Sequence, residues 1–205
     1  MALINIRRYQ VKNMESPTTA STFNIFISGQ LESAIFPMGP DADEIFCRYE
    51  VVAGADWELV SGCQNGITQT ASNKCGHYND KIVLNMPIEI TFKSTSPHGW
   101  PQIIVIIYGK TRWGVETVLG YSRAHVPIFG SNSARRITAP ILIPKCTNLV
   151  SQMTSWITGK NPELKNPRIL LDANINGLAV ESYGEIILMF NVISRGANQL
   201  GYDWG

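Results

Sequence analysis

The side chains that could do chemistry in this chain are few and widely spaced. The three histidines, His77, His98 and His125, lie outside any G-x-S-x-G or H-E-x-x-H context. Nucleophilic catalysis needs a serine or cysteine beside a positioned base. A phosphate site of the usual kind needs a G-x-x-x-x-G-K-[ST] or G-x-G-x-x-G loop, which the sequence lacks. The residues therefore predict a protein that is not an enzyme.

Metal and cofactor binding is not expected either. Four cysteines without C-x-x-C spacing are present: Cys47, Cys63, Cys75 and Cys146. Arg7 and Arg8 stand where a signal peptide would be apolar, so we expect no secretion and reduced thiols, some in the core. Cys75 and His77 form the one close pair of zinc ligands, and a zinc site needs three or four.

A calcium site would need six to eight oxygen ligands from neighbouring loops. Asp41 and Asp43 share one loop and could begin such a site. Lys110 and Arg112 follow the apolar run at 103–108, and their charges would repel a cation. We therefore expect no functional calcium site.

Acidic and basic residues are unevenly distributed along the chain. Residues 32–58 hold seven acids and one base, whereas residues 93–168 hold ten bases and two acids. This asymmetry predicts opposite-sign faces or loop ends that orient a charged partner, with an ordinary solvated surface as the alternative. The candidates for contact with a partner protein or anionic lipid are Lys110, Arg112, Arg135, Arg136, Lys160, Lys165 and Arg168. The five tryptophans show no platform spacing, so we expect no nucleic-acid binding.

The elements that would position these side chains are mostly short strands. A chain of 205 residues with 44% hydrophobic content can form one full domain. Alternating or β-branched runs predict strands at 23–36 (bulged near Gly29), 45–52, 57–60, 67–72, 88–93, 103–108, 115–128, 135–144 and 184–194. One helix is predicted over 147–159. Together they indicate an all-β antiparallel sandwich of about eight strands with one short late helix, and a barrel is the alternative.

The segment 87–109 is predicted to form the centre of the fold. Ile88, Ile90 and Phe92 alternate with polar residues, and the run at 103–108 is apolar throughout, as in a strand buried on both faces. Residues 94–102, STSPHGWPQ, contain two prolines and a glycine, so they should turn the chain. We expect the two runs to form a hairpin, with Trp100 packed against the sheet.

Two segments closely resemble the B9-domain family, FKSTSPHGWPQ at 92–102 within this central part and GQLESAIFP at 29–37 near the start of the chain. Further agreement comes from GADW at 54–57, GYSRAHVP at 120–127, TSWITG at 154–159 and LGYD at 200–203. The residues that match the first motif are Phe92, Lys93, Ser94, Thr95, Pro97, Gly99, Trp100 and Pro101. Ser96 stands where the family would have Asn, a change that suits the same turn.

We divide the chain into an N-terminal arm (1–21), a B9 domain (22–195) and a C-terminal tail (196–205), and the resemblance covers roughly residues 22–203. It implies a C2-like sandwich without calcium ligands, in a non-enzymatic adaptor of the ciliary transition zone. The implied location is the cytoplasmic side of the ciliary base, at the basal body and cytoskeleton. The arm and the loop at 38–44 are longer than the family's usual form, so the resemblance implies no function for them.

The same resemblance implies the partners. These are a second B9-domain protein and the Meckel-syndrome type 1 protein, with tectonic-type membrane proteins reached indirectly. Such an assembly would gate protein entry into the cilium and support ciliogenesis. The alternative is a calcium-independent C2-like module that contacts phospholipid membranes peripherally through the basic loops.

Overall fold

The computed structural model describes residues 21–37, 42–72, 81–110, 114–128, 134–145, 153, 161–171 and 179–202. These residues form ten strands and two short 3-10 helices. The strands are β1 (Phe23–Ile35), β2 (Glu44–Val52), β3 (Trp57–Gly62), β4 (Asn65–Ile67), β5 (Ala71–Ser72), β6 (Lys81–Ser94), β7 (Gln102–Lys110), β8 (Glu116–His125), β9 (Arg135–Pro144) and β10 (Val180–Arg195). The 3-10 helices are η1 (Pro167–Leu171) and η2 (Asn198–Leu200).

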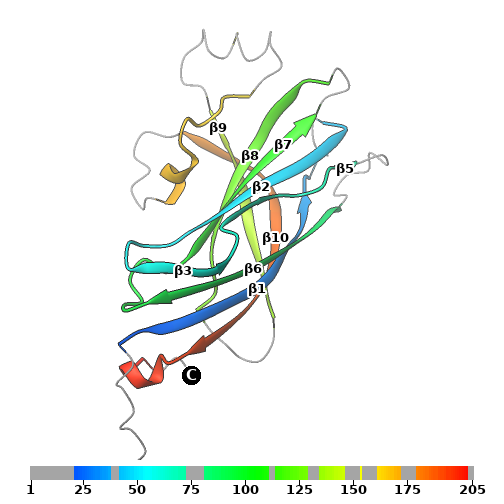
Figure 1. Ribbon diagram of the computed structural model, residues 1–205. Coiled ribbons are helices and arrows are strands. Elements are labelled where there is room, and N and C mark those ends of the chain that lie inside the picture. The colour runs from blue at the N-terminus through cyan, green and yellow to red at the C-terminus, as the bar shows by residue number, and fades with distance from the viewer. Residues whose placement is uncertain are drawn as a thin grey trace, which may run out of the picture.

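All strand pairs are antiparallel, in the order β3-β6-β1-β10-β9-β8-β7-β2-β4, and β5 also pairs with β2. This continuous sheet curls until its two ends face each other (Figure 1). We call β3, β6, β1 and β10 the β1 layer, and β8, β7, β2, β4 and β5 the β2 layer; β9 joins them. The predicted all-β, C2-like antiparallel sandwich is confirmed, with ten strands in place of about eight.

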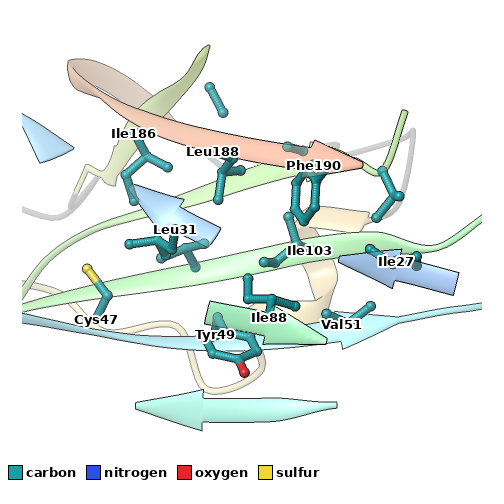
Figure 2. Packing of buried hydrophobic residues seen from close by; sticks show 14 of the residues in the cluster. Ile27, Leu31, Cys47, Tyr49, Val51, Ile88, Ile103, Ile186, Leu188 and Phe190 are labelled. Carbon is teal, nitrogen blue, oxygen red and sulfur yellow. The ribbon is translucent and has the colours of Figure 1, made fainter. Parts of the chain in front are cut away.

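The core fills the space between the two layers. Figure 2 shows Ile27, Leu31 and Phe190 of the β1 layer directed toward Tyr49 and Ile103 of the β2 layer. The alternation predicted for β2 is confirmed, because every second residue from Ile45 to Val51 is at most 3% exposed. Each buried aliphatic side chain of this size contributes about 1.5–3 kcal/mol relative to an exposed one.

The bulge predicted near Gly29 lies slightly later in β1. The register shifts between Leu31 and Ser33 against both neighbouring strands. Against β10 the additional residue is Glu32, because Leu31 and Ser33 face the adjacent residues Leu188 and Ile187. Against β6 the additional residue lies on β6, because Leu31 and Ser33 face Met86 and Val83. Gly29 has a different role, because a Cβ atom there would lie 2.3 Å from the main-chain oxygen of Met189. The glycine allows β10 to approach β1 closely.

The predicted hairpin between 88–93 and 103–108 is wrong. β6 pairs with β1 and β3, whereas β7 pairs with β2 and β8. Residues 95–101 therefore carry the chain from one layer to the other, and we call them the crossover. Its two prolines cannot donate to a ladder, which suits a connection between layers as well as it suits a tight turn.

Several other predictions need smaller corrections. The strand expected at 67–72 is divided into β4 and β5 by Thr68, whose hydroxyl oxygen accepts a hydrogen bond from the Cys47 main-chain nitrogen at 2.9 Å. β7 is buried on both faces only as far as Val105, since Ile106 and Tyr108 are half-buried. The tail is partly folded: Ala197 is buried beside η2, and the Tyr202 ring lies 6.0 Å from that of Phe23.

Two predicted segments fall largely outside the described residues. Of the arm at 1–21 the structure describes Ser21, and of the helix at 147–159 it describes Met153. No helix in the described part of the chain is long and apolar enough to cross a membrane.

Candidate interaction surfaces

The family motif at 92–102 joins the two layers of the sandwich. The Trp57 indole nitrogen donates to the main-chain oxygen of His98 at 2.7 Å, and the Trp100 indole nitrogen donates to that of Val126 at 2.8 Å. The two indole rings meet edge to face, with centroids 5.3 Å apart. Trp57 begins β3 in the β1 layer and Val126 follows β8 in the β2 layer, so the pair connects both layers through the crossover.

The crossover also approaches the chain before β3 very closely. The Gly54 main-chain nitrogen donates to the Gly99 oxygen at 2.8 Å. A Cβ atom on Gly99 would lie 2.6 Å from the Gly54 Cα atom, and Gly99 has a φ of +70°. Both the contact and the backbone conformation therefore require glycine at position 99.

The remaining motif residues have structural surroundings. Phe92 is fully buried, Ser94 donates from its hydroxyl to the main-chain oxygen of Asp56 at 3.0 Å, and Pro101 is buried. Lys93 forms an exposed ion pair with Glu58 at 3.2 Å. Thr95 is exposed and Pro97 is half-buried. These contacts assign the motif to the fold, and none of them forms a catalytic grouping.

The basic candidate residues do not form one patch. Lys110 lies 3.9 Å from Glu44, Arg136 pairs with Glu32, and Arg168 pairs with Glu50. Arg135 and Lys165 are exposed and make no ion pair with another described residue. Arg112 and Lys160 lie outside the described residues.

The charge blocks of the sequence neutralise each other in the fold. Four acids from the early block, Glu32, Glu44, Glu50 and Glu58, pair with four bases from the later block, Arg136, Lys110, Arg168 and Lys93. Two of these pairs lie on opposite sides of the molecule, because Glu32 is on the outer face of the β1 layer and Glu50 on that of the β2 layer. These eight residues therefore do not create the opposite-sign faces predicted from the sequence.

The bulge residue Glu32 forms a small ionic cluster across the β1 layer. Its carboxylate accepts hydrogen bonds from Arg136 on β9 and from Lys81 on β6. These bonds lower the pKa of Glu32 to about 2 from an ordinary value of 4.5. The carboxylate remains ionised at neutral pH and links three separate strands.

Residues 161–171, which we call the strap, cover the outer face of β7 and β8. Asn161 donates from its side-chain nitrogen to the Val118 oxygen at 2.9 Å, and the Leu164 main-chain nitrogen donates to the Tyr121 hydroxyl at 2.8 Å. Arg123 donates to the Leu170 oxygen at 2.7 Å. Burial beneath the strap raises the pKa of Tyr121. Leu170 of the strap forms a buried cluster with Val118 and Tyr121 of β8.

Two open grooves lie at the edges of the sandwich. The first, about 400 Å³, lies on the β2 layer between β4 and the strap. The second, about 520 Å³, lies on the β1 side and includes Phe26, Met86 and Glu89. Neither groove is predictable from the sequence, because their linings come from strands far apart in the chain. The sequence signal for the second groove is Phe26, an apolar residue at an outward position of the alternating strand β1. The structure leaves its side chain 41% exposed.

Potential metal ligands do not gather in the described part of the chain. Its histidine, cysteine, aspartate and glutamate residues form no group of three or more that could hold an ion. Asp43, Lys110 and His98 lie within this part, whereas Asp41, Cys75 and His77 lie outside it.

Comparison with known proteins gives one consistent family. The family model for the ciliary basal body-associated B9 protein matches residues 25–193. The chain is 50% identical to B9 domain-containing protein 1 of Drosophila melanogaster over 196 residues, which are 93% of this chain and 81% of that protein. It is 39% identical to the Mus musculus protein of the same name over 186 residues, covering 90% and 88%. A more distant match is B9 domain-containing protein 2 of Bos taurus, 25% identical over 180 residues, covering 87% and 98%.

Proposed function

This chain belongs to the B9 family of ciliary basal body-associated proteins, and from this premise we propose that it is a non-catalytic adaptor of the ciliary transition zone. Its partners in this proposal are a second B9-domain protein and the Meckel-syndrome type 1 protein, with tectonic-type membrane proteins contacted indirectly. The assembly would control protein entry into the cilium and support ciliogenesis from the cytoplasmic side of the ciliary base.

The observation that supports an adaptor most directly is the use of the family motif. The motif connects the layers through Trp57, Gly99 and Trp100, so it maintains a rigid sandwich. The outer faces and edges of that sandwich, including the two grooves, remain available for protein contacts. Rigid surfaces bind with less loss of conformational entropy than flexible ones.

Reconstitution from purified components tests the proposal. The chain should elute with B9 domain-containing protein 2 and the Meckel-syndrome type 1 protein as one complex of fixed stoichiometry in size-exclusion chromatography. Separate elution at concentrations well above those in cells would contradict the adaptor function. A tagged chain should also collect at the ciliary base, between the basal body and the axoneme, and cells without the chain should admit membrane proteins that are normally excluded.

The alternative function, peripheral phospholipid binding, receives less support from the geometry. Lys110, Arg136 and Arg168 are engaged by carboxylates of the same chain, which reduces the positive potential that they would offer to anionic lipid. Flotation with vesicles rich in phosphatidylserine, repeated after joint charge reversal at Arg135 and Arg136, decides the matter. Flotation that depends on these two arginines would favour the lipid function.

A further inference from the structure

The groove between β4 and the strap combines a charged rim with an apolar lining. We call it the β4 groove. Its volume is about 400 Å³, and its lining includes Arg48, Glu50, Ile67, Ile106 and Pro167. β2 and β7 supply the middle of the lining, β4 supplies one wall, and Pro167 of the strap supplies the other. An open groove bounded by two separate segments has the form that suits a side chain or short segment of another protein.

Arg48 is the charged group that this groove presents. Its guanidinium carbon lies 5.9 Å from the centroid of the Tyr108 ring, and Tyr108 stacks on Phe46 with centroids 5.0 Å apart and planes 7° apart. This aromatic support orients the guanidinium group. Arg48 forms no ion pair with any residue that the structure describes. Its N–H donors therefore face a partner without first having to leave a carboxylate of this chain.

The rim carries a net positive charge. Glu50 is the one carboxylate in the lining, and Arg168 of the strap already pairs with it. Arg168, which lies outside the lining, thus neutralises Glu50, and Arg48 leaves the groove with a formal charge of +1. Charge complementarity consequently favours a ligand with a carboxylate, and a guanidinium group binds a carboxylate through two parallel hydrogen bonds.

The apolar part of the groove sets the second requirement for a ligand. Ile67 is 53% exposed, although it belongs to a strand, and Ile106 is half-buried beside the groove. A single exposed isoleucine is ordinary on a protein surface. Here it is the cross-strand partner of Arg48 within the groove, so an apolar side chain next to a carboxylate would satisfy both residues together.

We propose that the β4 groove is a docking site for an acidic and apolar segment of a partner protein. An aspartate or glutamate of that segment binds Arg48, and a neighbouring large apolar side chain packs against Ile67 and Ile106. The assignment rests on the adaptor function proposed above, since it names the surface that meets another B9-domain protein. It makes Arg48 a specificity-determining residue of that contact.

The first experiment measures the groove without the natural partner. A displayed library of short random peptides is selected on the immobilised full chain, and enriched peptides are then titrated against Arg48→Glu and Ile67→Asp. We expect the enriched peptides to place an acidic residue beside a large apolar one and to lose at least about tenfold in affinity on either variant. A selection that yields no binders, peptides of another composition, or wild-type affinity for either variant overturns the proposal.

Matched controls separate the groove from general effects of charge and polarity. Arg195→Glu makes the same charge change on β10, and Val60→Asp introduces the same acid at a position 56% exposed on β3. Both controls should retain wild-type peptide affinity. Circular dichroism melting of all four variants should show the same fold, because each altered side chain is exposed. Equal losses in the controls would overturn the assignment to the groove.

The second experiment uses the complex with B9 domain-containing protein 2. If the wild-type chain forms the complex, Arg48→Glu and Ile67→Asp should weaken it at least about tenfold, and the two controls should not. A complex that tolerates both groove variants overturns the docking site and leaves the adaptor function intact. If the wild-type chain forms no complex, the adaptor function fails, and the peptide selection still decides whether the groove binds such a segment.

Discussion

Trp57 donates a hydrogen bond from its indole nitrogen to the main-chain oxygen of His98 at 2.7 Å, across 41 positions of the sequence. The ring is 8% exposed and meets Phe23, Phe92 and Trp100 edge to face. One side chain thus connects the start of β3, the hydrophobic core and the crossover between the two layers. Such a connection fixes β3, the end strand of the sheet, against the crossover, with which it shares no strand pairing.

Replacing Trp57 with phenylalanine should destabilise the protein by about 1–3 kcal/mol. The variant leaves the His98 oxygen without its indole donor, and the smaller ring loses packing against Trp100. Urea unfolding followed by circular dichroism measures the change. Leu59→Ala, at a position 39% exposed on the same strand, is the control and should change the free energy of unfolding by about 0.5 kcal/mol or less. A wild-type midpoint for Trp57→Phe would contradict the role of the bond.

Two glycines with similar backbone angles should respond differently to alanine. Gly99 has a φ of +70° and lies against Gly54, whereas Gly114 has a φ of +76° and nothing within 4 Å of an added Cβ atom. Gly114→Ala should cost about 1–2 kcal/mol for the left-handed conformation alone. Gly99→Ala should cost clearly more, because the Gly54 backbone must also move. Equal losses in thermal unfolding would show that the contact between the two glycines contributes little.

The strands were predictable from the sequence because alternation records burial directly. In β2 the inward residues Ile45, Cys47, Tyr49 and Val51 are apolar, and their neighbours are polar or half-exposed. The pairing of strands was not predictable in the same way. Alternation identifies the buried face of β6 but not its neighbours, so proximity in sequence suggested β7, whereas β1 and β3 are the partners.

The candidate surfaces were even less accessible from the sequence. The excess of acids early and bases late did contain information, since Glu32 and Arg136, 104 positions apart, bind each other. Charge composition alone cannot distinguish such pairing from two free faces, because the outcome depends on register and on the bulge that turns Glu32 outward. Arg48 and Pro167 meet at one groove for similar reasons, since the strap lies over β7.

The two described cysteines should differ sharply in reactivity. Cys47 is fully buried in the core, and burial raises its pKa far above the ordinary thiol value, whereas Cys63 is exposed. Iodoacetamide at neutral pH should therefore label Cys63 rapidly and leave Cys47 unmodified until the protein unfolds. Peptide mass spectrometry with and without urea measures both positions in one sample. Early labelling of Cys47 would show that β2 opens in the native state.

The strap should loosen when Asn161 is replaced with alanine. The variant removes the side-chain bond to the main-chain oxygen of the buried residue Val118. A loss of about 1 kcal/mol corresponds to an increase of about fivefold in the equilibrium constant for local opening. Hydrogen exchange should accelerate in 161–171 and stay unchanged in β1. Lys165→Ala, at an exposed position of the same strap, is the control. Equal acceleration of exchange in both variants would show that the loss of the Asn161 bond is not the cause.

The ionic cluster around Glu32 should make stability depend on pH in the acid range. The folded-state pKa of about 2 lies below the ordinary value of 4.5, so the folded protein binds this proton less readily than the unfolded chain does. The stabilising contribution is complete above about pH 4.5 and disappears as the pH falls toward about 2. The wild-type chain should therefore be more stable than Glu32→Gln at neutral pH, and urea titrations should show the difference shrinking through this window.

Glu58→Gln, which alters an exposed pair with Lys93, should remain close to wild type throughout. A gap between wild type and Glu32→Gln that stays constant from neutral pH to about pH 2 would contradict the assignment, because protonation removes the negative charge that strengthens the bonds from Arg136 and Lys81.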